Sequence, residues 1–141
     1  MATVVLVHGA WAAVGSGRRS SRCCGAAGHE VHATTATGLG DRVHLASPAV
    51  DLDTHITDVV NLLEFEELTE VTLVGWSYGG MIITGVAEWV PDRLAGLVYL
   101  DALVPADQYP LCASNRSLSP ITPISSHLSS SCVVADPDCW A

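Results

Sequence analysis

Lysine is absent from this sequence of 141 residues, and arginine occurs only six times. Because fifteen carboxylic side chains outweigh these cations, the formal net charge is −9 and no basic patch can be assembled. This argues against a nucleic acid or an anionic membrane as a partner and leaves small neutral or cationic ligands. Hydrophobic residues make up 49% of the chain, which is enough for one domain with a buried core.

The N-terminal residues lack the features of a targeting signal. Residues 1–7 have no positively charged segment, and their apolar run is too short for a secretory signal or a membrane span. We therefore expect a cytoplasmic protein. The cysteines form no CxxC pair, so free thiols are expected rather than a zinc site, a redox motif or a disulfide framework. The five cysteines are Cys23, Cys24, Cys112, Cys132 and Cys139.

Motifs for a metal or a cofactor are also missing. The Gly-Ser-Gly segment at residues 15–17 is similar to the start of a dinucleotide fingerprint, but the third glycine is absent and the preceding strand is too distant. His29, His32 and His44 fall across an expected strand and loop, a spacing that favours solvated positions over a metal site. We expect neither a metal nor a cofactor.

Apolar runs and helical patterns alternate through the first hundred residues. Runs typical of buried strands occur at residues 3–7, 30–35, 71–74 and 94–100. Asp53 is the expected N-cap of a helix, and a second helix is expected at residues 80–90, before Pro91. The apolar face of the first of these helices comprises Ile56, Val59, Val60 and Leu63. Residues 37–50 are rich in glycine, proline, serine and charge, which predicts a long loop.

This alternation predicts an α/β fold with a parallel sheet, because parallel neighbours need crossover helices. The pattern stops near residue 110. Residues 111–141 contain eight serines, three prolines and three cysteines, and they show no helical or strand period. We therefore expect a partial domain over residues 1–110 and a low-complexity, disordered tail over residues 111–141.

The sequence Gly-Trp-Ser-Tyr-Gly at residues 75–79 has the form GxSxG and stands between an expected buried strand and an expected helix. This is the setting of a nucleophile elbow, in which glycines permit a strained turn that lifts the serine hydroxyl above the sheet. We predict Ser77 as a catalytic nucleophile, with Gly75 and Gly79 as the elbow glycines.

Two backbone N–H groups are candidates for an oxyanion hole, the donors that stabilise negative charge on the carbonyl oxygen of a substrate. Tyr78 follows the nucleophile, and Ala10 lies on the loop after the first strand, which are the positions that such donors occupy. His8 precedes this loop and is interpreted as a structural residue rather than as the catalytic base.

Four stretches of the chain carry a family resemblance: residues 6–11 (LVHGAW), 27–45 (AGHEVHATTATGLGDRVHL), 51–65 (DLDTHITDVVNLLEF) and 71–105, with the elbow. Together they cover about two-thirds of the chain and resemble the esterase branch of the α/β-hydrolases, which also contains plant methylesterases and hydroxynitrile lyases. The resemblance implies the N-terminal part of an α/β-hydrolase core, with Ser77 as nucleophile and the amides of Ala10 and Tyr78 as oxyanion hole. Lyases of this branch have a threonine near the position of Ala10 and use a lysine, so this chain resembles the ester hydrolases more closely.

The resemblance also implies an acid and a histidine late in the chain, in a protein about twice as long. Asp101, at the carboxyl end of the last expected strand, is a candidate acid, with a structural turn residue as the alternative. His127 is the only histidine after Ser77. No strand precedes it, so we do not expect it to act as the base.

Two segments depart from the family pattern. Residues 12–24 and the tail from about residue 111 together contain all five cysteines and four of the six arginines. Such clustering is typical of translation in a shifted reading frame. We hypothesise that frame errors spoil the first helix and end the family sequence near residue 110, with a shorter natural family member as the alternative. Resequencing of the coding DNA distinguishes the two.

These observations predict a serine hydrolase that acts on small carboxylic esters through an acyl-enzyme on Ser77. A catalytically inactive remnant without the histidine of the triad is one alternative, and a module that binds small hydrophobic ligands is another. If the tail adds no strand, residues 94–100 form an exposed sheet edge, and we expect an isolated chain of low solubility.

Overall fold

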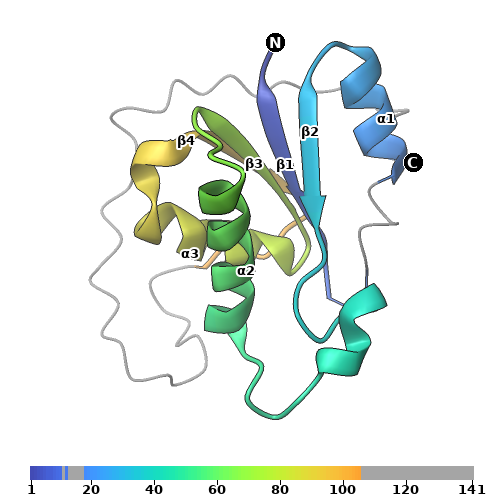
Figure 1. Cartoon of the computed structure of the whole chain (residues 1–141), viewed down its shortest axis with the longest axis vertical. Coiled ribbons are helices and arrows are strands. Elements are labelled where there is room, and N and C mark those ends of the chain that lie inside the picture. Colours follow the sequence, from blue (N-terminus) through green and yellow to red (C-terminus); the bar gives the residue numbers. More distant parts are fainter. Residues whose placement is uncertain (11, 13–17, 106–141) are drawn as a thin grey trace.

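A computed structural model describes residues 1–10, 12 and 18–105 of the protein (Figure 1). These residues form four strands, three α-helices and two 3-10 helices. In chain order they are β1 (Thr3–Val7), α1 (Arg18–Ala26), β2 (Glu30–Thr34), η2 (Gly40–Leu45), α2 (Leu52–Phe65), β3 (Val71–Trp76), α3 (Gly79–Trp89), η3 (Pro91–Arg93) and β4 (Leu94–Leu100). The expected tail at residues 111–141 and His127 lie outside the described residues.

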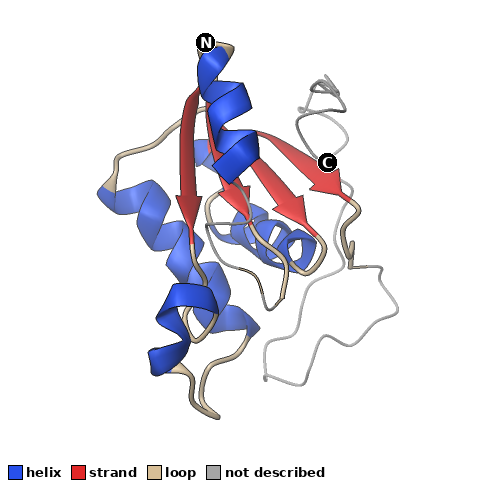
Figure 2. Ribbon diagram, turned by 90° about the vertical axis from the view of Figure 1, so that its right-hand side faces the viewer, coloured by secondary structure: helices blue, strands red, loops and turns tan. Residues whose placement is uncertain are grey.

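The four strands form one parallel sheet in the order β2-β1-β3-β4. The chain leaves β1 toward β2 on one side and then crosses back to β3 and β4 on the other. Because crossovers between parallel strands are right-handed, this reversal places α1 on one face of the sheet and α2 and α3 on the opposite face. Figure 2 shows α1 and α3 on opposite sides of the strands. The predicted α/β fold with a parallel sheet is confirmed.

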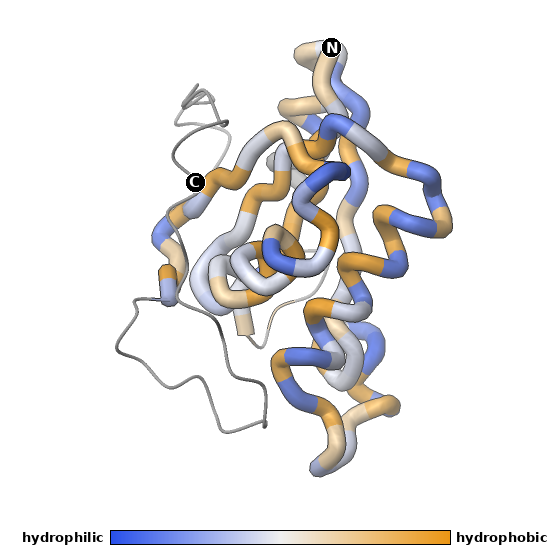
Figure 3. Tube along the Cα trace, turned by 90° about the vertical axis from the view of Figure 1, so that its left-hand side faces the viewer, coloured by the Kyte–Doolittle hydropathy of each residue, from blue (hydrophilic) through white to orange (hydrophobic). Residues whose placement is uncertain are grey.

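The main core lies between the sheet and the two helices α2 and α3. The predicted apolar face of α2 is buried there, together with apolar residues of β1, β3 and α3. Leu63, Leu73, Ile82 and Ile83 are among the largest side chains that are fully buried. Figure 3 shows the alternation of hydrophobic and hydrophilic residues along the helices that produces these faces. Burial of this apolar surface is the main favourable contribution to folding.

The start of α2 differs from the prediction. Asp51, rather than Asp53, is the N-cap, and its carboxylate accepts hydrogen bonds from the backbone N–H and the hydroxyl of Thr54, both at 2.9 Å. The Thr54 hydroxyl in turn faces the Asp51 N–H, which completes a capping box. Thr54 stands three residues after Asp51, the spacing that a capping box requires, whereas Ile56 stands three residues after Asp53 and cannot form one.

Helix α1 also differs from the prediction, because the composition of residues 12–24 led us to expect a spoiled helix. The backbone is helical over Arg18–Ala26. Strands β1 and β2 are parallel neighbours, so the chain must cross over between them, and a helix packed on the sheet is the usual solution. This tertiary requirement outweighs a weak local pattern. The Gly-Ser-Gly segment at residues 15–17 lies outside the described residues.

Other boundaries differ by a few residues. Strand β3 extends two residues beyond the prediction, into the elbow, while β2 ends one residue earlier than expected. The long loop contains η2, a 3-10 helix with no buried residue. Strand β4 is as predicted and, among the described residues, pairs only with β3. No helix within the described ranges is long and apolar enough to cross a membrane.

Candidate active site

Ser77 lies in a two-residue turn between the end of β3 and the start of α3. Its φ angle is +52°, in the left-handed region that non-glycine residues rarely adopt. Such strain is concentrated at functional sites and costs about 1–3 kcal/mol, which the surrounding structure must offset. The turn projects a half-buried serine at the carboxyl end of a central parallel strand, where ligands bind in open α/β sheets.

The two predicted elbow glycines are required by close backbone contacts. A Cβ atom on Gly75 would lie 2.7 Å from the Gly79 carbonyl oxygen, well inside van der Waals contact. A Cβ atom on Gly79 would overlap the Val7 carbonyl oxygen at the end of β1. The first residue of α3 is therefore packed directly against the neighbouring strand, and no larger residue fits without displacement of the backbone.

The segment after β4 holds the turn from the other side. The Ser77 N–H donates to the Leu100 carbonyl at 3.3 Å, and the Leu103 N–H donates to the Ser77 carbonyl at 2.9 Å. Asp101 lies between these two anchors, with an exposed side chain and a φ of +43°. The carboxylate is thus placed on the loop beside the elbow, and the described residues give it no hydrogen bond to a histidine.

The loop after β1 contacts the Ser77 side chain. A Cβ atom on Gly9 would lie 3.1 Å from Ser77 Cβ and 3.6 Å from Ser77 Oγ, so the Gly9 backbone lies directly beside the Ser77 side chain. The next residue is Ala10, which is half-buried. The loop that carries one proposed oxyanion donor and the turn that carries the other are therefore neighbours in space.

His8 fixes the orientation of this loop. The imidazole is buried, and its Nε2 accepts a hydrogen bond from the Ala36 N–H at 3.0 Å. Nδ1 must then carry the proton of the neutral ring, and it donates to the Gly9 carbonyl at 2.7 Å. In a trans peptide the C=O and N–H groups point in opposite directions, so the Ala10 N–H points away from the His8 ring. Both ring nitrogens of His8 are occupied, as expected of a structural residue.

A second buried histidine, His55 of α2, lies behind the elbow and was not anticipated from the sequence. Its Nδ1 lies 2.9 Å from the Tyr78 hydroxyl, and its Nε2 lies 2.8 Å from the Thr37 carbonyl. The signal that could have found it is its position beside Ile56 on the apolar face of α2, where an imidazole needs partners. Neither nitrogen is directed to Ser77.

Thr37 is clamped further by the next turn of α2. The Asp58 carboxylate accepts hydrogen bonds from the Thr37 N–H at 2.6 Å and from the Thr37 hydroxyl at 2.9 Å. The Arg42 guanidinium donates to the Thr35 carbonyl at 2.9 Å and lies 3.4 Å from Asp58. The β2–α2 loop is therefore tied to α2 by side chains that the sequence left unassigned.

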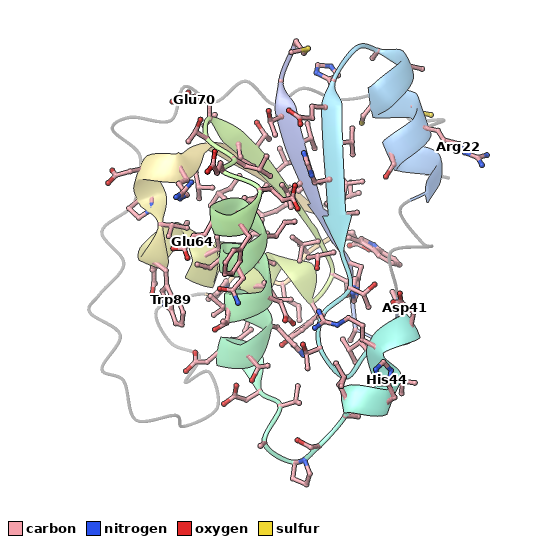
Figure 4. All side chains as sticks on the ribbon, viewed as in Figure 1. Arg22, Asp41, His44, Glu64, Glu70 and Trp89 are labelled. Atoms are coloured by element: carbon pink, nitrogen blue, oxygen red, sulfur yellow. The ribbon has the colours of Figure 1, made fainter. Side chains whose placement is uncertain are left out.

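The remaining described histidines lie on separate elements. His32 pairs with Glu30 at 3.1 Å on β2, and His29 Nδ1 lies 3.3 Å from the Ala2 N–H. His44 is exposed on η2, next to Asp41 (Figure 4). The hydroxyl of Thr35 donates to Asp41 and holds the pKa of this carboxyl below its ordinary value. Within the described ranges, no three histidine, cysteine or acidic residues gather in a group that could hold a metal ion, and Cys23 and Cys24 are free thiols.

The sequence profile of the alpha/beta hydrolase family matches residues 4–131. The carbendazim-hydrolysing esterase of Nocardioides sp. strain SG-4G is 51% identical over 105 residues, which are 74% of this chain and 43% of the esterase. The chain therefore spans less than half of the length of this curated relative.

Solved structures of hydrolases are similar to this chain over less than half of their own length. An extracellular α/β-hydrolase from a Paenibacillus species, described as a structural and functional homologue of tobacco salicylic acid binding protein 2, has a TM-score of 0.70 and 31% identity. The match covers 76% of this chain and 43% of that one. A pyrethroid hydrolase from Sphingobium faniae JZ-2 has a TM-score of 0.63 and 34% identity, covering 74% of this chain and 41% of its own.

Proposed function

Since the chain belongs to the α/β-hydrolase family, we propose that it carries the nucleophile and oxyanion hole of a serine hydrolase for small carboxylic esters. The observation that carries this proposal is the strained Ser77, with φ of +52° at the end of β3 and with the Gly9 backbone beside its hydroxyl. Strained backbone of this kind clusters at functional sites, so its occurrence at the serine of the GxSxG turn supports a catalytic role for Ser77.

In the proposed reaction the Ser77 hydroxyl attacks the ester carbonyl and loses its proton to a base. The carbonyl oxygen becomes an oxyanion, which the N–H groups of Ala10 and Tyr78 stabilise. Collapse of this intermediate breaks the ester C–O bond, and the alcohol leaves with the proton that the base returns to it, so that an acyl group remains on Ser77. Water then attacks the acyl carbonyl, which releases the acid and restores the Ser77 hydroxyl. Removal of one oxyanion donor typically lowers the rate by about 10²–10³-fold.

The substrate class rests on the relatives and on the charge of the chain. The relatives are named for hydrolysis of carbendazim and of pyrethroids, which supports esters and related acyl compounds as substrates. With a net charge of −9 and no lysine, the chain disfavours anionic substrates. We therefore propose small neutral or cationic esters. Asp101 is the proposed acid, because it follows β4 beside the elbow.

A second candidate function follows from the two buried histidines. Both ring nitrogens of His8 and of His55 are hydrogen-bonded away from Ser77, so neither ring is placed to accept the Ser77 proton. If no other group supplies the base, the chain retains the elbow without turnover. An unassisted serine hydroxyl is a weak nucleophile, which makes this alternative easy to distinguish.

A fluorophosphonate probe, which forms a covalent bond only with an activated serine, tests the proposal. We expect labelling of the protein and of Ser47→Ala, a control at an exposed serine. We expect no labelling of Ser77→Ala. Absence of labelling in the unmodified protein, with a normal circular dichroism spectrum, would favour the inactive alternative.

A further inference from the structure

We propose that His55 is a positioning residue for the oxyanion hole: by accepting a hydrogen bond from the Tyr78 hydroxyl, it sets where the Tyr78 backbone N–H lies. The catalytic part of this inference rests on the proposed function, whereas the structural part stands without it. The imidazole does not touch the substrate. It acts through the residue that follows the nucleophile.

The direction of the hydrogen bonds follows from the partners of the ring. Nε2 of His55 faces the carbonyl oxygen of Thr37 at 2.8 Å, and a carbonyl can only accept. Nε2 must therefore carry a proton. In the neutral ring this leaves Nδ1 as an acceptor, so the Tyr78 hydroxyl donates to it at 2.9 Å. The tautomer is thus assigned by the network.

The ring contact adds a second constraint on Tyr78. The two ring centroids are 5.7 Å apart with an interplanar angle of 82°, an edge-to-face arrangement. Tyr78 is also the N-cap of α3, with φ −57° and ψ −29°, so its backbone joins the strained Ser77 to the helix. Fixing this side chain from α2 therefore fixes the peptide that carries the proposed oxyanion donor.

Thr37, the second hydrogen-bond partner of the His55 ring, has further partners on α2. The Thr37 carbonyl accepts the hydrogen bond from His55 Nε2. The Asp58 carboxylate accepts hydrogen bonds from the Thr37 N–H at 2.6 Å and from the Thr37 hydroxyl at 2.9 Å. His55 and Asp58 lie three residues apart on α2, so they face the same side of the helix. The Tyr78 hydroxyl is thus connected through the His55 ring to a loop residue that Asp58 also binds.

Burial of an imidazole at this site costs free energy unless its ring nitrogens form hydrogen bonds. His55 is 7% exposed and stands next to Ile56, where a leucine would pack without any requirement for partners. A role confined to holding the loop at Thr37 would be served by the bond at Nε2. The positioning role requires the acceptor at Nδ1 specifically, and this difference makes the proposal testable.

Substitution of His55 by asparagine or by glutamine tests the roles of the two ring nitrogens separately. His55→Asn places an amide oxygen close to the position of Nδ1 and can accept the Tyr78 proton, whereas His55→Gln places an amide close to Nε2 and can serve only Thr37. We expect His55→Leu, His55→Gln and Tyr78→Phe to shift the backbone amide resonance of residue 78 and to accelerate the hydrogen exchange of this amide. We expect His55→Asn to restore both values toward those of the unmodified protein.

The same variants are then compared for the rate of fluorophosphonate labelling. A displaced oxyanion donor should lower this rate about 10–100-fold in His55→Leu and Tyr78→Phe, and the double variant should be no slower than either. The proposal is overturned if the Tyr78 amide is unchanged in His55→Leu, or if glutamine restores it as well as asparagine does. If the unmodified protein is not labelled, the proposed function fails, while the amide measurements still decide the role of His55.

Discussion

Replacement of Gly79 by alanine tests the contact between the elbow and β1 most directly. The added methyl group would overlap the Val7 carbonyl oxygen at the end of β1, and the backbone on either side is buried. The clash is between the added methyl group and backbone atoms of a strand, so no flexible side chain can move aside to relieve it. We therefore expect the two elements to separate slightly, and the loop at Gly9 to move away from Ser77.

The size of the effect follows from the geometry. Overpacking of a tight site costs typically about 1–3 kcal/mol, and at the first position of a helix the better propensity of alanine offsets only part of this. A net loss of about 2 kcal/mol lowers the melting temperature of a domain of this size by roughly 5–10 °C. It also removes a substantial fraction of a stability that is typically about 5–15 kcal/mol.

Thermal unfolding followed by circular dichroism measures this loss, with Gly96→Ala as the matched control. A Cβ atom on Gly96, in β4, would meet nothing within 4 Å, so this substitution should leave stability unchanged or raise it by about 0.4–1 kcal/mol. Fluorophosphonate labelling should fall in Gly79→Ala and persist in Gly96→Ala. Equal melting temperatures for the two variants would refute the packing of the elbow against β1.

Three further outcomes are expected. Leu63→Ala, at a fully buried position of α2, should cost about 2–5 kcal/mol in chemical denaturation, whereas Phe65→Ala, whose side chain is 83% exposed on the same helix, should cost little. Hydrogen bonds from the backbone N–H and the hydroxyl of Thr54 lower the pKa of Asp51. The N-cap contribution to stability is therefore present above the ordinary carboxyl pKa of about 3.9 and is lost as the pH falls through the lowered pKa of the folded state. Asp51→Asn should remove this pH-dependent component of the unfolding free energy, and an unchanged acid profile would contradict the assignment. Strand β4 pairs only with β3 among the described residues, so a charge introduced by Ala95→Lys at an exposed position should raise solubility in light scattering; equal aggregation of the variant and the unmodified protein would argue against edge pairing.

The elements of the fold were largely readable from the sequence, because their causes are local. Buried parallel strands are continuous apolar runs, so β1 and β4 were predicted with their observed bounds. The apolar face of α2 follows from helical periodicity. The elbow was predicted because its glycines and serine are adjacent in the chain, and the structure gives the physical reason in the contacts of Gly75 and Gly79.

Interactions between distant parts of the chain were decided only by the tertiary structure. The crossover from β1 to β2 contains a helix at Arg18–Ala26 in spite of the composition of this segment, and Asp51 rather than Asp53 caps α2. His55 and Tyr78 are 23 residues apart, and nothing in either neighbourhood indicates that one ring accepts a hydrogen bond from the other.

The sequence by itself therefore determined the family, the nucleophile candidate and the parallel strands, since these depend on short motifs and periodic patterns, whereas the strand order came from the structure. The tertiary structure decided what surrounds Ser77: the Gly9 backbone beside its hydroxyl, the segment after β4 that holds its carbonyl, and the two histidines that face away from it. Side chains acquire such partners only when separate elements pack together, and no local pattern records which elements will meet.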